Sequence, residues 1–227
     1  MAQGFRDRVE AGKALGDRLA EMSLDRPVVL GLARGGVPVA AQVARRLNAP
    51  LDVFVARKIG APGQPELGVG AVAEGGEPVF DAVLLRRLGL RPADLAATVA
   101  AEQAEIARRV AAYRPGRRRE PVTERTAVLV DDGLATGGTA RAGLAALRTR
   151  NPARLVLAVP VAPPETVARL AAHADDVVAL LMPRRFTAVG AWYRHFGQLS
   201  DDEVLAIVRA AAARRRDHAQ PQRQPDA

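Results

Sequence analysis

Two adjacent aspartates, Asp131 and Asp132, follow an apolar run and precede a turn rich in Gly and Thr, in the stretch VLVDDGLATGGTARAG. Neighbouring carboxylates repel each other, so such a pair needs hydrogen-bond donors or a cation. The turn leads into a predicted helix, where backbone N–H groups and the helix dipole favour an anion. The residues of this turn are Ala135, Thr136, Gly137, Gly138 and Thr139. The spacing predicts that the turn binds a phosphate. It also predicts that the two carboxylates accept hydrogen bonds from the hydroxyls of a sugar attached to that phosphate.

A second phosphate-binding loop is predicted in the stretch GLARGGVPVA, which follows another apolar run. Arg34 can donate two hydrogen bonds in a forked geometry, and Gly35 lets the backbone approach a ligand closely. The stretch ARKIG ends the next apolar run and contains Arg57 and Lys58. Lys13 and Lys58 are the only lysines in a chain with 33 basic residues, which marks Lys58 as a candidate site residue.

The composition restricts the classes of function that need to be considered. The chain has 227 residues, a net charge of +8 and no cysteine, which excludes disulfides and thiol chemistry. Its serines lack a nucleophile-elbow setting, and its charged N-terminal stretch does not resemble a signal peptide. We therefore expect a cytoplasmic protein without a membrane partner. The positive charge favours an anionic partner, but few aromatics accompany the arginine clusters, so nucleic acid is not the expected partner.

The alternation of short apolar runs and helical patterns predicts an α/β fold. The runs PVVLGLA, LDVFVA, AVLVDD, LVLAVPVA and DVVALLM show almost no polar alternation, which is typical of strands covered on both faces. Helical spacing occurs between them, in GVPVAAQVARRL, TARAGLAALRTR and PPETVARLAAHA. We expect a central, mostly parallel sheet flanked by helices in one domain, residues 1–213, followed by a disordered basic tail, 214–227.

Two segments interrupt this alternation. Residues 59–76 are rich in Gly and Pro, which predicts a flexible loop ending in a short strand, with EPVF pairing as a hairpin. Residues 81–120 are predicted to form a helical insertion, because apolar residues recur at helical spacing from Pro92 to Tyr113.

An alternative interpretation reads the first loop as part of a dinucleotide site. The pattern Gly31-x-Ala33-x-x-Gly36 follows a predicted strand, and Asp52 lies near the spacing expected for a ribose-binding carboxylate. However, Asp52 begins the second strand instead of ending it, and this interpretation leaves the acidic pair without a function. Two phosphate loops at the ends of separate strands are the stronger interpretation.

The stretch VLVDDGLATGGT resembles the 5-phosphoribosyl 1-pyrophosphate (PRPP) signature of type I phosphoribosyltransferases. The resemblance covers nearly everything up to about residue 213. It implies that Asp131 and Asp132 contact the ribose hydroxyls and that Ala135 to Thr139 hold the 5′-phosphate. It also assigns the pyrophosphate to Arg34, Gly35, Arg57 and Lys58, with a cis peptide at Arg34–Gly35. Mg²⁺ is the implied cofactor, held mainly by the substrate near the two aspartates, with no direct protein metal site.

The resemblance implies a transferase in which a nitrogen nucleophile, such as a nucleobase, displaces pyrophosphate from PRPP. The segment 183–200 resembles the hood that holds the acceptor, with Phe186 and Trp192 as candidate stacking residues, although Trp192 can equally be core. Glu66 is a candidate for proton transfer in the flexible loop. Ala135 replaces the aspartate of 6-oxopurine enzymes, which argues against that acceptor class. A noncatalytic regulator that binds PRPP or nucleotides is the alternative, and a homo-oligomer stays open.

Overall fold

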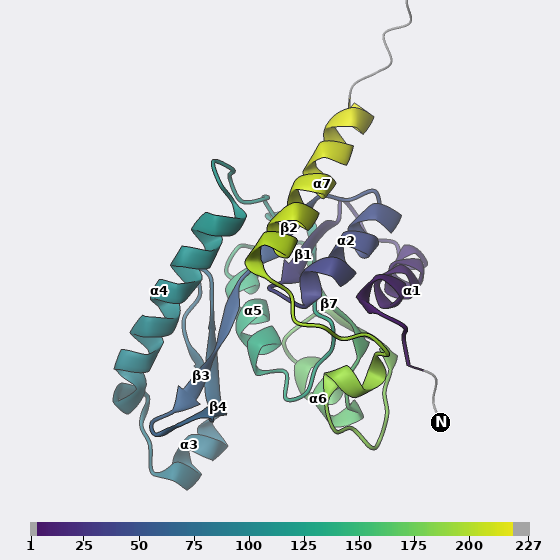
Figure 1. Ribbon diagram of the computed structural model, residues 1–227. Helices are drawn as coiled ribbons and strands as arrows, with labels where there is room; N and C mark the ends of the chain where they lie inside the picture. The colour runs from purple at the N-terminus through teal and green to yellow at the C-terminus, as the bar shows by residue number, and fades with distance from the viewer. Residues whose placement is uncertain (1–3, 220–227) are drawn as a thin grey trace, which may run out of the picture.

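The computed structural model describes residues 4–219 and contains a five-stranded parallel sheet at its centre (Figure 1). The strands are β1 (Val28–Leu32), β2 (Leu51–Phe54), β6 (Thr126–Val130), β7 (Arg154–Val161) and β8 (Asp176–Leu181). Their order is β2-β1-β6-β7-β8, and each neighbouring pair is parallel. β1, β2 and β6 are buried along their whole length, which explains their unbroken apolar sequences. The predicted α/β fold and its five strands are confirmed.

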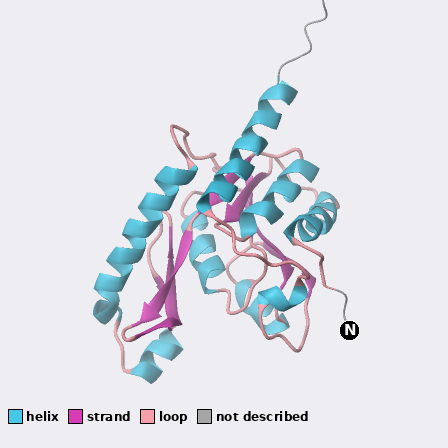
Figure 2. Cartoon of the chain, viewed as in Figure 1, coloured by secondary structure: helices cyan, strands magenta, loops and turns pink. Residues whose placement is uncertain are grey.

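Helices cover both faces of this sheet (Figures 1 and 2). On one face, α1 (Arg8–Ala20) and α2 (Gly36–Arg46) pack through Leu15, Leu19 and Val43 onto β1, β6 and β7. On the other face, α5 (Gly138–Arg148) and α6 (Pro164–Leu170) contribute Leu144, Leu147 and Leu170. The three helices predicted between the strands are α2, α5 and α6, whereas α1 was not predicted.

The last helix, α7 (Asp201–Ala219), packs against α2 and β2 through Val204, Val208 and Ala211. Its backbone remains helical through residues 214–219, so the expectation that a disordered tail begins at 214 was wrong for these residues. An uninterrupted run of good helix formers, AAAARRR, carries the helix past its last core contact. Residues 220–227 of the expected tail lie outside the described residues.

A small antiparallel sheet lies beside the central one and fits a hood of this fold class, although the hood was expected at residues 183–200. It consists of β3 (Ala56–Ala61), β4 (Gln64–Ala73) and β5 (Val79–Phe80). EPVF does pair with the preceding strand, but residues 59–76 are mostly strand, so the predicted loop was wrong. Gly60 and Pro65 occur where the β3–β4 register shifts, and such irregular pairing accommodates residues that normally interrupt strands.

The segment 81–120 contains α3 (Ala82–Leu88), a short 3₁₀ helix, η1 (Pro92–Leu95), and α4 (Ala96–Tyr113). Figure 1 shows α4 lying along the hairpin of β3 and β4, and Ile106 and Tyr113 share a core with Ile59 and Val69 of that hairpin. The amphipathic helix predicted from the sequence therefore packs against the small sheet. The segment 183–200 contains only the 3₁₀ helix η2 (Val189–Trp192) and loops.

A buried ion network joins the end of α4 to both sheets. The Arg114 guanidinium donates to Asp52 at 2.9 and 3.0 Å and to Glu74 at 2.8 and 3.0 Å. All three residues are buried, with exposed fractions of 8, 1 and 3%. Both carboxylates are thus occupied by a structural partner, and Asp52 does not point into a ligand site. This finding removes the carboxylate on which the dinucleotide interpretation depended.

Candidate functional site

The two predicted phosphate loops follow β1 and β6, which are neighbours at the centre of the sheet. From β1 the chain crosses to β2 on one side, and from β6 it crosses to β7 on the other. The strand order therefore reverses between β1 and β6. In open α/β sheets, ligands bind beyond the carboxyl ends of the strands at such a point.

A cavity of about 670 Å³ opens at this point. The entire turn from Ala135 to Thr139 lines it, together with Asp131. Gly137 has a left-handed backbone (φ 71°) as the N-cap of α5, a conformation that glycine adopts without a steric penalty. It is also closely packed, because a Cβ there would lie 2.8 Å from Leu170 Cδ1. The first backbone N–H groups of α5 consequently border the cavity, as a phosphate site requires.

The two aspartates have different environments. Asp131 lines the cavity, and its Oδ1 accepts a hydrogen bond from the backbone N–H of Asp132 at 2.9 Å. Asp132 instead accepts from Nε of Arg8 at 2.8 Å, in an ion pair whose side chains are both 13% exposed. Burial and the Asp132 charge raise the pKa of Asp131 well above its usual value. Burial also raises the pKa of Asp132, and the Arg8 guanidinium opposes this shift.

The loop after β1 lies directly against the acidic pair. A Cβ on Gly35 would be 2.1 Å from Oδ2 of Asp132, and one on Gly36 would be 2.5 Å from the Val130 carbonyl oxygen. Only residues without a side chain fit at these positions. The loop contains a cis peptide at Ala33–Arg34, one bond earlier than expected. The expected position, Arg34–Gly35, came from the family resemblance alone, because the residue types in this loop do not indicate which of the two peptide bonds is cis.

Arg34 points toward the start of α7, where its Nη1 lies 3.8 Å from Oδ1 of Asp201. The Tyr113 hydroxyl donates to the same oxygen at 2.5 Å, and this hydrogen bond lowers the pKa of Asp201. Arg34 is thus connected to α4 and α7. It does not line the large cavity, and its assignment to pyrophosphate stays a prediction.

The neighbouring residues Arg57 and Lys58 of β3 have separate partners. Lys58 lines the large cavity, and its Nζ donates to Oε2 of Glu66 at 3.2 Å and to the Glu66 carbonyl at 3.1 Å. Arg57 pairs with Glu102 of α4 through Nε at 2.6 Å. The hairpin therefore brings Lys58 and Glu66 to the cavity with Asp131, whereas α4 holds the Arg57 guanidinium outside it.

The candidate acceptor residues do not line the cavity, although Val189 from the same segment does. Trp192 has a buried indole N–H that lacks a hydrogen-bond partner among the described residues. Phe186 is partly exposed. Tyr193 anchors the segment, since its hydroxyl donates to the Asp132 carbonyl at 2.6 Å. The stacking roles of Phe186 and Trp192 stay predictions.

Sequence reasoning did not identify three arginines around the site. Arg8 binds Asp132, Arg169 donates to the Thr136 carbonyl at 2.9 Å, and Arg141 donates to the Phe80 carbonyl at 2.8 Å. One usable signal for the helix of Arg8 was the pattern D-x-x-E from Asp7 to Glu10, a common helix start. Asp7 does cap α1 by accepting from the Glu10 N–H at 2.8 Å. The partners of the arginines depend on tertiary contacts that no local pattern indicates.

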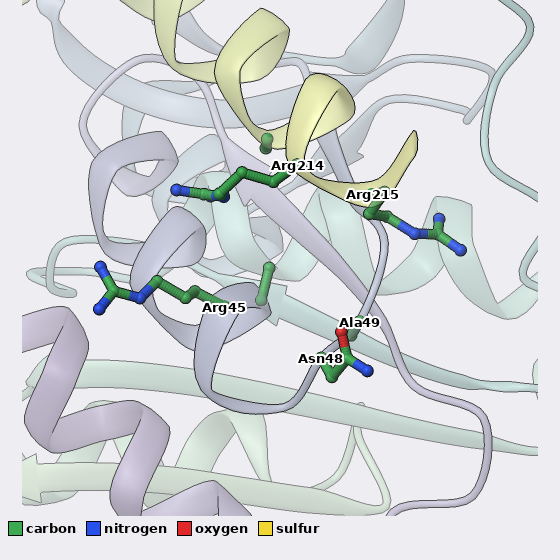
Figure 3. Close-up of a pocket in the computed structure, with 7 residues that line it drawn as sticks. Arg45, Asn48, Ala49, Arg214 and Arg215 are labelled. Atoms are coloured by element: carbon green, nitrogen blue, oxygen red, sulfur yellow. The ribbon is translucent and has the colours of Figure 1, made fainter. Parts of the chain in front are cut away.

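Another cavity, of about 240 Å³, lies between α2 and α7 and is lined by Arg45, Asn48, Arg214 and Arg215 (Figure 3). The side chains of Arg214 and Arg215 point in opposite directions there, so the arginines do not converge on one ligand position. Asn48 and Ala49 precede β2, which places this cavity at the amino ends of the strands. The acidic pair, the two loops and Lys58 all lie toward the other edge.

The predicted magnesium ion would be held mainly by the substrate, and the carboxylate of Asp131 fits such an ion. Among the described residues, no three His, Asp or Glu side chains gather into a metal site. Asp131 offers hard oxygen donors at the cavity, and Mg²⁺ is commonly bound by one or two carboxylates together with substrate phosphates.

Within residues 4–219, no helix has the length and apolar character needed to cross a membrane.

The comparison with known proteins agrees with this geometry. The family model for the phosphoribosyl transferase domain matches residues 7–190. A provisionally named phosphoribosyl transferase of Mycobacterium tuberculosis H37Rv is 50% identical over 204 residues, 90% of this chain and 46% of the relative. A protein of strain CDC 1551 matches equally well, so the chain spans about half the length of these relatives.

The crystal structure of TT1426 from Thermus thermophilus superposes with a TM-score of 0.77 and 48% identity, covering 90% of this chain and 97% of that one. The family model and the M. tuberculosis relatives cover most of the chain, including both loops and the acidic pair. The chain belongs to the type I phosphoribosyltransferase family.

Proposed function

We propose that the protein transfers a phosphoribosyl group from PRPP to a nitrogen nucleophile, with release of pyrophosphate and assistance from Mg²⁺. The observation that carries the proposal is a single cavity lined by Asp131, the turn from Ala135 to Thr139, and Lys58. These groups match the three parts of PRPP, namely the ribose hydroxyls, the 5′-phosphate and the pyrophosphate.

The chain's own residues act by binding and orienting the reactants. Asp131 accepts hydrogen bonds from the ribose hydroxyls, and the N–H groups at the start of α5 hold the 5′-phosphate. Lys58 offsets the negative charge on the departing pyrophosphate. The acceptor nitrogen forms a bond to C1 of the ribose while the bond from C1 to the pyrophosphate oxygen breaks, and its electrons leave with pyrophosphate. Alignment of the two reactants supplies much of the rate increase, and no covalent enzyme intermediate is needed.

Magnesium, when bound beside Asp131, would offset charge on the pyrophosphate oxygens. The acceptor must also lose a proton. Glu66 or water takes this proton, because Glu66 lines the cavity and its side chain is 97% exposed, where it pairs with Lys58. Closure of the hairpin that carries Glu66 and Lys58 would exclude water from the cavity.

The proposed acceptor is a nucleobase or a related nitrogen compound outside the 6-oxopurine class. Ala135 lines the cavity immediately before Thr136 and has no proton-accepting group. General base assistance typically contributes about 10²- to 10⁴-fold in rate, which is enough to separate classes of substrate. Hypoxanthine and guanine should therefore be poor acceptors.

Isothermal titration with PRPP and Mg²⁺, followed by a pyrophosphate-release screen over bases, tests the proposal. We expect PRPP binding and release of pyrophosphate with at least one nitrogen base. Binding of PRPP without release in any mixture would instead favour a noncatalytic regulator. Absence of PRPP binding would refute both. An Asp131→Asn variant is the matched control, since it keeps the shape of the side chain and removes its charge.

A further inference from the structure

Arg8 of α1 contacts Asp132 and two residues of the segment that follows η2. Its Nε donates to Asp132 at 2.8 Å, and its Nη1 donates to the Gly197 carbonyl at 2.9 Å. Its Cζ lies 3.8 Å from the centre of the Phe196 ring, a distance at which the cation and the ring attract each other. One guanidinium thus joins the N-terminal helix, the acidic pair and the segment that follows η2.

We propose that Arg8 is a positioning residue, which holds Asp132 against the loop of Gly35 and leaves Asp131 as the carboxylate that receives the ribose. This inference rests on the proposed function, because it assigns unequal roles to the two aspartates within the same PRPP site. It assigns a role in binding PRPP to a residue that lies outside both phosphate loops.

The packing around Asp132 supports this division of roles. Its Oδ2 atom, which receives the Arg8 hydrogen bond, is also the atom that occupies the space a Cβ on Gly35 would fill. Its backbone carbonyl accepts the Tyr193 hydroxyl. Asp132 is therefore fixed through both its side chain and its backbone. Of the two aspartates, Asp131 alone lines the large cavity.

Arg8 also connects the donor site to the candidate acceptor segment. The N–H of Phe5 donates to the Trp192 carbonyl at 2.8 Å, and the N–H of Arg194 donates back to Phe5 at 2.9 Å. The rings of Tyr193 and Phe196 stack with centroids 4.9 Å apart, and Arg8 covers the Phe196 ring. Loss of the Arg8 side chain would therefore remove a contact from the Phe196 ring as well as from Asp132.

The test compares Arg8→Gln and Arg8→Lys with wild type at pH 7 by titration with PRPP and Mg²⁺ and, separately, with pyrophosphate and Mg²⁺. Arg18→Gln is the matched control, because Arg18 lies on the same helix in an exposed pair with Glu21. We expect Arg8→Gln to bind PRPP at least tenfold more weakly than wild type but to bind pyrophosphate with unchanged affinity, because Lys58 and not Asp132 is proposed to face pyrophosphate. Arg8→Lys should recover part of the affinity for PRPP but still bind at least threefold more weakly than wild type, since one ammonium cannot reproduce the forked contacts.

Each outcome separates the inference from the function on which it rests. If wild type fails to bind PRPP, the proposed function is wrong and the inference fails with it. If wild type binds but Arg8→Gln shows the same affinity, the inference alone is overturned. Equal losses of affinity for PRPP and for pyrophosphate would show a merely structural role and would also overturn it. If Arg8→Gln does not fold, Arg8→Lys decides, and wild-type affinity in that variant contradicts the inference.

Discussion

The two neighbouring aspartates should respond differently when each is changed to asparagine. Asp131→Asn removes a charge that burial and Asp132 disfavour. Asp132→Asn also removes a charge that burial disfavours, but it weakens the contact with Arg8, which is largely buried and has no other carboxylate contact among the described residues. We therefore expect Asp131→Asn to stabilise the fold at neutral pH and Asp132→Asn to leave its stability nearly unchanged.

The size of the Asp132→Asn effect follows from the ion pair. A hydrogen bond to a charged group contributes about 1.5–3 kcal/mol. The asparagine oxygen can still accept from Arg8, and the substitution also relieves repulsion from Asp131. The burial that raises the pKa of Asp132 also disfavours its charge, so these effects largely offset the lost ion pair. We expect a net change within about 1 kcal/mol, which corresponds to a change in Tm of at most roughly 2–4 °C for a domain of this size.

The sign for Asp131 follows from its raised pKa. A carboxyl group with a higher pKa in the folded state costs stability when it ionises, about 1.4 kcal/mol for each pKa unit of difference. That cost is fully present above the folded pKa and disappears as the pH falls toward the unfolded value near 4. The advantage of Asp131→Asn over wild type should therefore be largest at pH 7–8 and vanish at low pH.

Urea denaturation of both variants and wild type at pH 7.5 and at low pH measures these differences. The Arg8→Gln/Asp132→Asn double variant supplies the coupling energy between the two residues. Equal and same-signed effects of the two aspartate substitutions at pH 7.5 would refute the division of roles. A coupling energy near zero would show that the Arg8–Asp132 contact does not stabilise the fold.

Three further predictions concern the substrate. Gly138→Ala should fold as well as wild type but bind PRPP at least tenfold more weakly by titration, because its Cβ meets only Thr136 Oγ1 at 4.0 Å yet enters the phosphate turn. Undiminished binding would place the 5′-phosphate elsewhere. Lys58→Ala should weaken binding of PRPP and pyrophosphate more than binding of ribose 5-phosphate, and equal losses for all three would contradict its placement. Ala135→Asp should increase pyrophosphate release with hypoxanthine, whereas efficient hypoxanthine turnover by wild type would refute the argument about the missing carboxylate.

The parts of the molecule that local patterns determine were predictable. The five strands, the helices α2, α5 and α6, and the positions of both loops follow from apolar runs, helical spacing and glycines between residues 27 and 182. The hairpin of β3 and β4 was misread because Gly60 and Pro65 resemble loop residues, and only the pairing between the strands makes them part of a sheet.

The arrangement of charges was not predictable, because it depends on residues far apart in the chain. Nothing near Arg8 in the sequence indicates that it meets Asp132, which is 124 residues away. Arg114 likewise lies within a basic cluster that reads as exposed surface, yet it is buried between Asp52 and Glu74. The sequence therefore indicated the loops and the acidic pair of the candidate site more readily than the groups that hold them in place.

The pairing between the N-terminal residues and the segment after η2 has a consequence for how the domain folds. Arg8 meets the carbonyl of Gly197 across 189 positions, and Phe5 forms a parallel bridge with Tyr193. Contacts between such distant positions form only after the entropy of a long loop has been lost, and they slow folding. On the ribosome, α1 can pack against α2 early, but Arg8 cannot acquire all of its partners until residue 197 has emerged. The proposed donor site should therefore be completed only after the sheet that supports it.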